Sequence, residues 1–565
     1  MTTGGSTTGG STPGEAAVGA ATAGSAAGPA AMAGSAGEAR PPTTPAVQPD
    51  GLGRQGRRRE SHRRLILAVL CVSLLVVSLD NTILNVALPV MVRSMHATSS
   101  QLQWIVDAYA VVFAGLLLVA GSLGDRLGRK WIFVAGLGLF AVGSATAAFS
   151  GTPDHLIAAR AFMGVGAAAI MPSTLSILTN VFQSDGDRAR AIGIWSGTSG
   201  LGIAIGPVAG GWLLAHYWWG SVFLVNVPIA LVGLVLALAL VPNSKNPDSK
   251  PPDPVGAALS VAGMGLLLWG LIEAPTYGWT SVSFLGATAA AVVVLAAFIA
   301  WERHSSHPML ELSFFSSRRF SAAMGALGLV IFALMGGLFL LTQYLQFSLG
   351  YSPLETGLRI APIAVVVLVC APLSIAAARR VGTKVVVCAG MVLIAIGLGL
   401  LSRVTVGGTY LEALPAFFLM GAGSGLAFAP CTESVMGSLP RDQAGVGSAT
   451  NSAALQIGGA LGVAVLGSLL NTRYQSRLAP VLSHYPIPAP IRHLITGSLG
   501  GALGVAHGVG GALGHGLSVF ARGAFVSGLD LAMTAGTAVV ATAAVVVLLV
   551  LPSRQPASSA DADEP

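Results

Sequence analysis

The sequence predicts an all-α integral membrane protein with about fourteen transmembrane helices. Hydrophobic residues make up 53% of the chain and charged residues only 9%, whereas an ordinary soluble domain has roughly 25% charged residues. Apolar segments long enough to cross ~30 Å of hydrocarbon recur along the chain, and the short polar joints between them hold nearly all the charges. A soluble fold could not bury this much apolar surface, so the bilayer must act as the solvent.

The apolar segments predict spans in the following order: 65–91, 102–123, 131–150, 155–182, 189–213, 221–241, 254–272, 282–301, 320–345, 357–378, 383–402, 411–434, 444–470 and 530–552.

Both ends of the chain are expected to lie in the cytoplasm. Residues 1–60 form a Gly/Ala/Ser/Thr/Pro tract without an apolar segment, which is typical of a disordered tail and not of a signal peptide. A basic cluster from Arg54 to Arg64 follows it, and the positive-inside rule places this cluster in the cytoplasm. An even number of spans returns the tail 553–565 to the same side. The long segment 471–529 is expected to be an extracytoplasmic loop, either a cap or disordered.

The net charge of +7 does not indicate a nucleic-acid partner, because the cytoplasmic margins of the helices account for the excess. All four cysteines fall inside apolar spans, where they are interpreted as small buried hydrophobes. No histidine lies in the interior of a span, and no metal site, cofactor site or hydrolytic triad is predicted.

Two parts of the sequence resemble each other. The joint 124–130 after span two has a weaker copy at 378–384 after span ten, and the glycines at 164–166 are echoed by those at 421–423. Parallel repeats of this kind place two helical bundles about an axis along the membrane normal, with a substrate path between them near the midplane.

The predicted organisation is therefore a bundle of six helices at 61–242, an inserted hairpin of spans seven and eight at 243–319, and a second six-helix bundle at 320–552. The two bundles are expected to be pseudo-symmetric.

Three motifs carry a resemblance to a known family. The segment Gly121–Lys130 resembles the signature between helices two and three of the major facilitator superfamily, and Leu79–Pro89 is similar to the motif of its fourteen-helix drug:proton antiporter branch. The array of span five resembles the motif of exporters that exchange drug for proton. It comprises Gly197, Gly200, Gly202, Gly206, Pro207, Gly210 and Gly211, of which Gly202, Gly206, Pro207 and Gly210 are taken as the antiporter motif. The resemblance covers nearly all of residues 61–552 and argues against a sugar carrier.

The joint after span two is predicted to act as a conformational lock. Gly124 and Gly128 allow a tight turn, while Asp125, Arg126 and Arg129 supply opposite charges between helix ends. An ordinary positive-inside loop would explain the bases, but not the glycine spacing or the acid.

The glycines of span five permit close helix crossings, and Pro207 removes one helix hydrogen bond, so this helix is expected to bend and to pack against the other half. Ordinary glycine-rich packing explains single glycines, but not the whole array. A phosphate-binding loop is excluded because no strand and no Lys-Ser/Thr accompany the glycines.

Three charged residues lie well inside predicted spans, at similar depth: Asp80, Asp107 and Arg160. A charge at a helix centre costs about 2.5–3.5 kcal/mol on insertion scales, so pairing inside the bundle is expected. Arg160 also matches the arginine of the family's fourth-helix motif, which the resemblance implicates in proton coupling. Asp80 is predicted to be the principal proton carrier, Arg160 its partner and Asp107 a secondary site. The alternative is a static structural pair.

Side chains that are candidates to line a substrate path are Trp104, Tyr109, Gln343, Tyr344 and Gln346. Packing, or an aromatic belt at the membrane interface, explains each of them equally well.

The resemblance implies a monomeric, proton-coupled exporter of amphipathic, antibiotic-like small molecules in a bacterial inner membrane, and the Ala/Gly/Val/Arg-rich composition favours an actinobacterial source. An exporter of an endogenous metabolite or lipid would carry the same motifs. A membrane sensor or scaffold is a third alternative, and a membrane enzyme a fourth, for which no catalytic cluster is visible.

Overall fold

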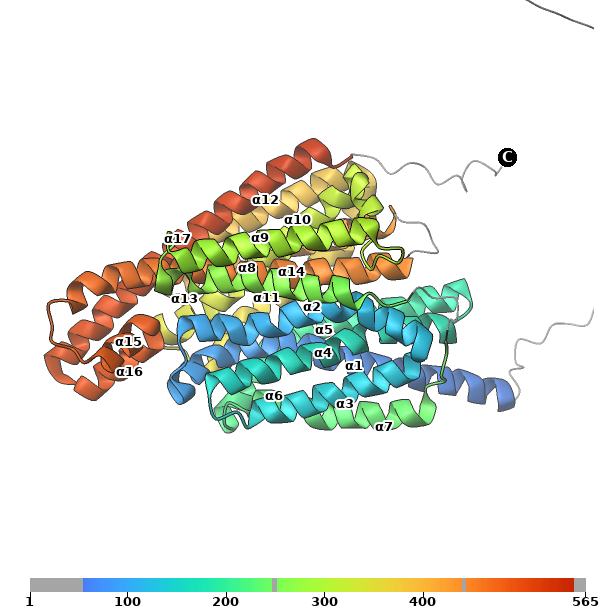
Figure 1. The fold of residues 1–565 in the computed structure, drawn as a ribbon, viewed down its shortest axis with the longest axis horizontal. Helices are drawn as coiled ribbons and strands as arrows, with labels where there is room; N and C mark the ends of the chain where they lie inside the picture. Colours follow the sequence, from blue (N-terminus) through green and yellow to red (C-terminus); the bar gives the residue numbers. More distant parts are fainter. Residues whose placement is uncertain (1–53, 246–250, 439–443, 553–565) are drawn as a thin grey trace, which may run out of the picture. The chain divides into compact units, whose positions relative to one another are not determined.

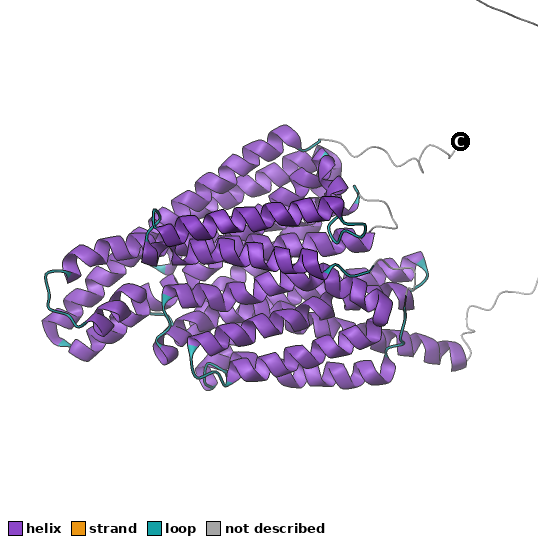
Figure 2. Ribbon diagram, viewed as in Figure 1, coloured by secondary structure: helices purple, strands orange, loops and turns teal. Residues whose placement is uncertain are grey.

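The computed structural model describes residues 54–245, 251–438 and 444–552. Figures 1 and 2 show that the regular elements in these ranges are helices. Among the described residues, 14 helical segments are long and apolar enough to cross a membrane, which confirms the predicted fold class. The predicted tails, 553–565 and all but the end of 1–60, lie outside the described residues.

The elements are α1 (Arg54–Met95), α2 (Ser99–Leu127), α3 (Arg129–Ala148), α4 (Pro153–Val181), α5 (Asp185–His216), α6 (Ser221–Leu224), α7 (Asn226–Leu240), α8 (Pro254–Tyr277), α9 (Val282–His304), the 3₁₀ turn η1 (Leu312–Ser316), α10 (Arg318–Gln343), the π turn η2 (Tyr344–Ser348), α11 (Pro353–Val381), α12 (Thr383–Leu401), α13 (Tyr410–Met436), α14 (Ala444–Leu482), α15 (Ala489–Gly497), α16 (Leu499–Val509) and α17 (Gly511–Val550). We call α1–α7 the first half and α10–α17 the second half.

Helices α2 and α11 begin and end in the same way. A capping box starts each one, formed by Thr98 with Gln101 in the first half and by Ser352 with Glu355 in the second. Each box satisfies backbone N–H groups that the first helical turn leaves unpaired.

Each of the two helices also ends at a glycine with positive φ, +123° at Gly128 and +92° at Gly382. Other residues rarely adopt this backbone conformation, so the glycines at these joints are a local structural requirement.

Glycines also set equivalent helix crossings in the two halves. A Cβ atom on Gly164 of α4 would lie 2.7 Å from the carbonyl oxygen of Tyr109 in α2. A Cβ on Gly421 of α13 would lie 2.7 Å from the carbonyl oxygen of Ile363 in α11. Helices can approach this closely only where the side chain is absent.

Two further helix contacts of the first half also have an equivalent in the second half. Gly206 of α5 packs against Thr82 of α1, as Gly462 of α14 packs against Phe332 of α10. Helix α3 packs on α7 and, correspondingly, α12 packs on α17. These matched crossings support the internal repeat that the sequence indicates.

The hairpin α8–α9 packs against both halves through α8, which contacts α2 and α14. The hydroxyl of Ser100 in α2 donates to the carbonyl oxygen of Ile272 in α8 at 3.3 Å. Apolar side chains of three helices form the contact: Ala110 and Val111 of α2, Leu268 and Ile272 of α8, and Ala460 and Ala464 of α14. The hairpin therefore bridges the junction between the halves.

The segment 471–529 is helical, in place of the predicted long loop. Helix α14 continues to Leu482, α15 and α16 follow, and α17 begins at Gly511 (Figure 1). The buried Tyr474 hydroxyl donates to the carbonyl oxygen of Ile495 at 2.9 Å, which ties α15 to α14. The low helix propensity of this glycine-rich segment is overridden by such packing.

Helix α16, itself part of the second half, also contacts the first half at one end of the bundle. Gly500 lies against Val92 of α1 and Phe347 of η2, and Gly497, which ends α15, lies against Thr98 at the start of α2. The helices of this segment therefore cap the end of the bundle where the two halves meet.

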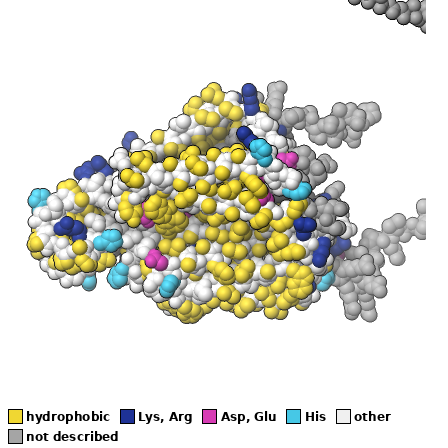
Figure 3. Space-filling model, viewed as in Figure 1, with side chains coloured by type: hydrophobic (Ala, Val, Ile, Leu, Met, Phe, Trp, Pro, Cys, Tyr) yellow, Lys and Arg dark blue, Asp and Glu magenta, His cyan; other side chains and the backbone are white. Residues whose placement is uncertain are grey.

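On the face drawn in Figure 3, hydrophobic side chains cover the broad middle, while lysines, arginines and histidines gather toward the ends. Large apolar side chains such as Val282 and Val293 of α9 are 89% and 66% exposed. An apolar surface of this extent is unusual for a soluble protein and suits contact with lipid.

Candidate proton-coupling site and the contacts between the halves

The predicted charges at residues 80 and 160 meet in a buried ion pair between α1 and α4. Arg160 Nη1 donates to Asp80 Oδ2, and the two side chains are 1% and 0% exposed. Arg160 Nε also donates to the carbonyl oxygen of Ile105 at 3.0 Å. Asn226, at the start of α7, donates through Nδ2 to Asp80 Oδ1 at 2.9 Å. Four helices therefore hold this pair.

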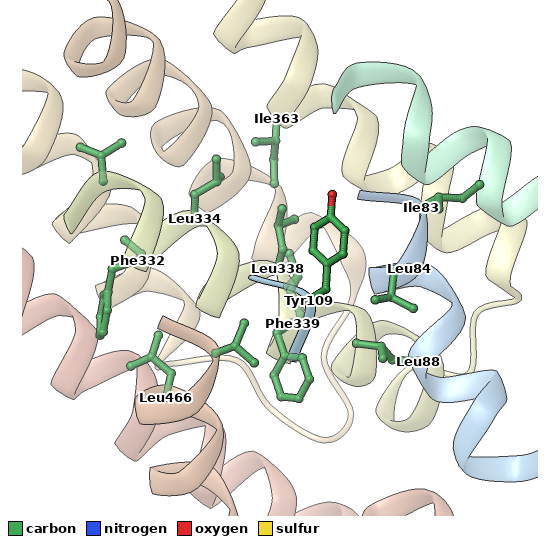
Figure 4. Packing of buried hydrophobic residues seen from close by; sticks show 14 of the residues in the cluster. Ile83, Leu84, Leu88, Tyr109, Phe332, Leu334, Leu338, Phe339, Ile363 and Leu466 are labelled. Atoms are coloured by element: carbon green, nitrogen blue, oxygen red, sulfur yellow. The ribbon is translucent and has the colours of Figure 1, made fainter. Parts of the chain in front are cut away.

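Tyr109 of α2 completes the surroundings of the guanidinium group. Its ring centre lies 4.3 Å from the Arg160 guanidinium carbon, within the range of a cation–π contact. Figure 4 shows Tyr109 among buried side chains of both halves, including Leu84 of α1 and Leu338 of α10.

A buried ion pair is sensitive to the loss of either partner. Removing one charge leaves the other unpaired in a medium of low dielectric constant, at a cost of about 3–5 kcal/mol. A proton on Asp80 would cancel its charge without removing the side chain. A change in the charge of either partner would therefore weaken the contact between α1 and α4.

Asp107 does not join the pair. It is completely buried in α2, and neither carboxylate oxygen has a hydrogen-bond partner among the described residues. An unsatisfied acid inside a span is costly and marks a functional position by default. Asp80 and Asp107 lie at similar predicted depth but in different surroundings, because only Asp80 has hydrogen-bond partners among the described residues.

Several polar contacts join the two halves at one end of the bundle. Gln103 of α2 donates to the carbonyl oxygens of Val463 and Ala464 in α14, at 3.1 and 3.3 Å. Gln346 of η2 donates to the carbonyl oxygen of Val86 in α1 at 2.9 Å. Arg93 of α1 donates to the carbonyl oxygen of Gln346 at 3.5 Å, and its guanidinium carbon lies 5.3 Å from the Phe347 ring centre.

Helix α5 crosses α11 at the same end. A Cβ on Gly211 would lie 2.7 Å from the Cα atom of Leu354, and Gly357 of α11 packs on the backbone of Pro207. At the other end of α5, a Cβ on Gly193 or Gly197 would meet no atom of another described helix within 4 Å. The described contacts of α5 with the second half therefore concentrate near its carboxyl end.

The remaining antiporter-motif glycines face α1. A Cβ on Gly202 would lie 2.7 Å from that of Ser78, and one on Gly210 would lie 2.7 Å from Ile83 Cγ1. Helix α5 is thus held between α1 of its own half and α11 of the other.

The predicted lock residues form a network within the first half. Arg129 Nε donates to Asp125 Oδ1 at 2.7 Å, and Arg129 Nη1 donates to the carbonyl oxygen of Ser176 in α4 at 3.3 Å. Gly124 faces the hydroxyl of Ser173, whereas Arg126 is exposed. The acid and one base of the motif therefore tie the α2–α3 joint to α4.

The five candidates for the substrate path lie in different surroundings. Trp104 packs against the apolar contact with α8, Tyr344 donates to the carbonyl oxygen of Thr405, and Gln343 donates to its own helix. Tyr109 stacks on Arg160, and Gln346 joins the halves. The structure does not bring the five together into one site.

Sequence reasoning missed the polar residues that complete these contacts: Asn226, Gln103 and Arg93. The signal for Asn226 was its place between Val225 and Val227, because a polar side chain inside an apolar span is itself a functional indication. Among the described residues, no group of three or more His, Cys, Asp and Glu side chains is placed to hold a metal ion.

Comparison with known proteins adds independent evidence. The family model described as Major Facilitator Superfamily matches residues 70–463. The multidrug efflux pump LfrA of Mycolicibacterium smegmatis is 36% identical over 85% of this chain and 95% of its own. The tetracenomycin C resistance and export protein of Streptomyces glaucescens is 34% identical over 85% of this chain and 90% of its own.

A solved structure shares the fold. A bacterial homologue of the human lysosomal transporter Spinster, solved in an inward-facing and unoccupied conformation, aligns with a TM-score of 0.59 at 17% identity, over 86% of this chain and 97% of its own.

Proposed function

The chain belongs to the major facilitator superfamily, among its multidrug exporters, and we propose that it is a drug:proton antiporter that works by alternating access. It is a multi-pass membrane transporter and not an enzyme. The observation that carries the proposal of proton coupling is the buried pair of Asp80 and Arg160, held by four helices of one half.

In this proposal, Asp80 carries the transported proton. When Asp80 is ionised, Arg160 and Asn226 hold it and α1 stays close to α4. When a proton neutralises Asp80, the attraction to Arg160 falls, and a conformation with these helices further apart becomes more populated. Asp107, buried without a partner, would be a second site of proton exchange.

The arrangement of contacts supports alternating access by two pseudo-symmetric bundles. With the cytoplasmic termini predicted by the positive-inside rule, the end at which Gln103, Gln346 and Gly211 join the halves faces outward. The structure would then be closed to the outside, and the opposite conformation would require these contacts to break. The lock at Asp125 and Arg129 would control that switch from the inner end.

The proposed substrates are amphipathic, antibiotic-like small molecules, and the proposed location is a bacterial cell membrane with the protein as a monomer. The names of the relatives, a multidrug efflux pump and an antibiotic export protein, support this substrate class. If a substrate screen instead identified an endogenous metabolite or lipid as the preferred cargo, the mechanism would stand and the substrate class would change.

The test is uptake of ethidium, a lipophilic cationic dye, into everted membrane vesicles with an acidic interior. We expect uptake that a protonophore abolishes and that Asp80→Asn eliminates, because the variant cannot release a proton. Asp530→Asn is the matched control, since Asp530 is an exposed acid within α17. Uptake that survives the protonophore but fails without ATP would exclude an antiporter.

A second experiment separates proton coupling from a static pair. The double variant Asp80→Asn with Arg160→Gln removes both charges, so a purely structural pair predicts restored transport. We expect no coupled transport from purified protein in liposomes, measured as dye-induced proton release. Full coupled transport by the double variant would refute the role of Asp80.

A further inference from the structure

An apolar groove lies between α12 and α17, away from the junction of the halves. Its volume is about 620 Å³, in the range of small-molecule sites. The lining residues include Ala395, Gly399, Ala541 and Ala544, which leave the space because their side chains are small. The larger lining side chains are exposed: Val392 46%, Ile396 48%, Val545 57% and Leu548 48%.

The uncharged polar side chains that line the groove, Thr537 and Cys388, already have hydrogen-bond partners. Thr537 Oγ1 donates to the carbonyl oxygens of Ala395 and Met533, at 3.3 and 2.8 Å. Cys388 Sγ lies 3.5 Å from the carbonyl oxygen of Ala544. These groups offer nothing to a polar ligand, so the body of the groove suits a hydrocarbon chain.

One end of the groove is charged. Arg403, just after α12, lines this end and is exposed, and its guanidinium group has no hydrogen-bond or ion-pair partner among the described residues. From Cys388 to Arg403 the groove follows α12 for about 22 Å at 1.5 Å per residue. The groove is longer than half of the ~30 Å hydrocarbon core. Arg403, at one end, can therefore reach the headgroup layer while the rest of the groove lies in hydrocarbon.

We propose that this groove binds one anionic phospholipid, with an acyl chain between α12 and α17 and the headgroup phosphate at Arg403. Charge complementarity selects this occupant, because a zwitterionic lipid would bring a second cation close to the arginine. Two other arginines at this end of the bundle, Arg93 and Arg359, already have partners: Arg93 contacts Gln346 and Phe347, and Arg359 lies over Tyr351. An arginine guanidinium group binds a phosphate through charge-assisted hydrogen bonds, which makes a lipid headgroup phosphate a suitable partner for Arg403.

The test is native mass spectrometry of the purified full-length protein with equimolar phosphatidylglycerol and phosphatidylcholine of identical acyl chains. The wild type should retain phosphatidylglycerol preferentially. The variant Arg403→Gln lacks one arginine near the headgroups, so its selectivity for phosphatidylglycerol should be about fivefold lower than that of the wild type. Arg477→Gln removes an exposed arginine of α14 outside the groove and should leave the selectivity unchanged.

Two further arms locate the lipid. Ala541→Trp fills the groove from an exposed position and should reduce retention of both lipids, and a photoreactive acyl chain should label α12 and α17. Millimolar inorganic phosphate should not displace phosphatidylglycerol. Equal losses in Arg403→Gln and Arg477→Gln, labelling confined to other helices, or displacement by phosphate would each overturn the proposal.

Discussion

Arg160 in the first half and Phe417 in the second occupy equivalent positions. Each lies four residues before a glycine: Gly164 packs on α2 and Gly421 packs on α11, at the same distance. Both side chains are completely or almost completely buried. One half thus places a charge where the other places an aromatic ring.

The partner position differs in the same way. Asp80 lies two residues before Thr82, the α1 residue that contacts Gly206. In the second half, Val330 lies two residues before Phe332, the α10 residue that contacts Gly462. The halves share their backbone crossings, while the buried ion pair is present at this position in the first half alone. Helix packing and proton chemistry are therefore separable properties of this fold, and each can be tested by exchanging matched positions.

The largest effect is expected from breaking the ion pair. Arg160→Met leaves Asp80 buried without its partner, so we expect complete loss of coupled transport and a stability loss of about 3–5 kcal/mol. Phe417→Leu, at the equivalent apolar position, leaves a small cavity but no unpaired charge, so it should cost less stability than Arg160→Met and retain coupling. Proton release in liposomes and apparent melting temperature in detergent measure the two effects. Equal losses of coupling in both variants would show that the halves do not differ in this function.

The glycine crossings should respond alike in the two halves. A Cβ on Gly166 would lie 2.7 Å from the Phe140 backbone nitrogen, and one on Gly423 would lie 2.9 Å from that of Ile394. We expect Gly166→Ala and Gly423→Ala each to destabilise the protein by about 1–3 kcal/mol through overpacking, seen as similar falls in melting temperature. Gly138→Ala is the control, because its Cβ would make only ordinary contact at 3.7 Å. A large effect in one half alone would argue against equivalent crossings.

Asp107 offers a comparison between an acid and the small residue that replaces it. Its counterpart in α11 is Ala361. Asp107 lies two residues before Tyr109, which contacts Gly164, and Ala361 lies two residues before Ile363, which contacts Gly421. Asp107→Ala removes an unsatisfied buried group, so we expect a stability gain of about 1–3 kcal/mol, offset in part by the space left. Transport should fall less than in Asp80→Asn. Unchanged transport with a raised melting temperature would remove Asp107 from the proton path.

The smallest effect is expected at the joints. Asp125 lies three residues before Gly128 and pairs with Arg129. The equivalent position in the second half, three residues before Gly382, holds Arg379. A partly exposed pair contributes about 0.2–1 kcal/mol, so Asp125→Asn should slow turnover by up to about fivefold. Substrate affinity, measured by equilibrium dye binding, should stay the same, and Arg379→Gln should change neither. A large loss of binding in Asp125→Asn would point to substrate contact in place of a lock.

Much of the fold could be predicted because the bilayer imposes simple rules on sequence. A span must be long and apolar, so the spans were visible as segments, and the two glycine-flanked joints revealed the repeat. The pairing of Asp80 with Arg160 was predictable for the same reason, since two opposite charges at similar depth in hydrocarbon have few other partners. Depth also predicted a partner for Asp107, which has none among the described residues. Depth says nothing about which face of a helix a side chain occupies.

The sequence by itself determined the membrane class, the spans, the turn glycines and the buried charges, since each depends on local composition or on the cost of burying a charge in lipid. Only the tertiary structure decided that Asn226 and Tyr109 complete the ion pair, that α8 bridges α2 and α14, and that α16 spans the end of both halves. Those contacts join residues far apart in the chain. They depend on the rotation and crossing of whole helices, which local sequence does not specify.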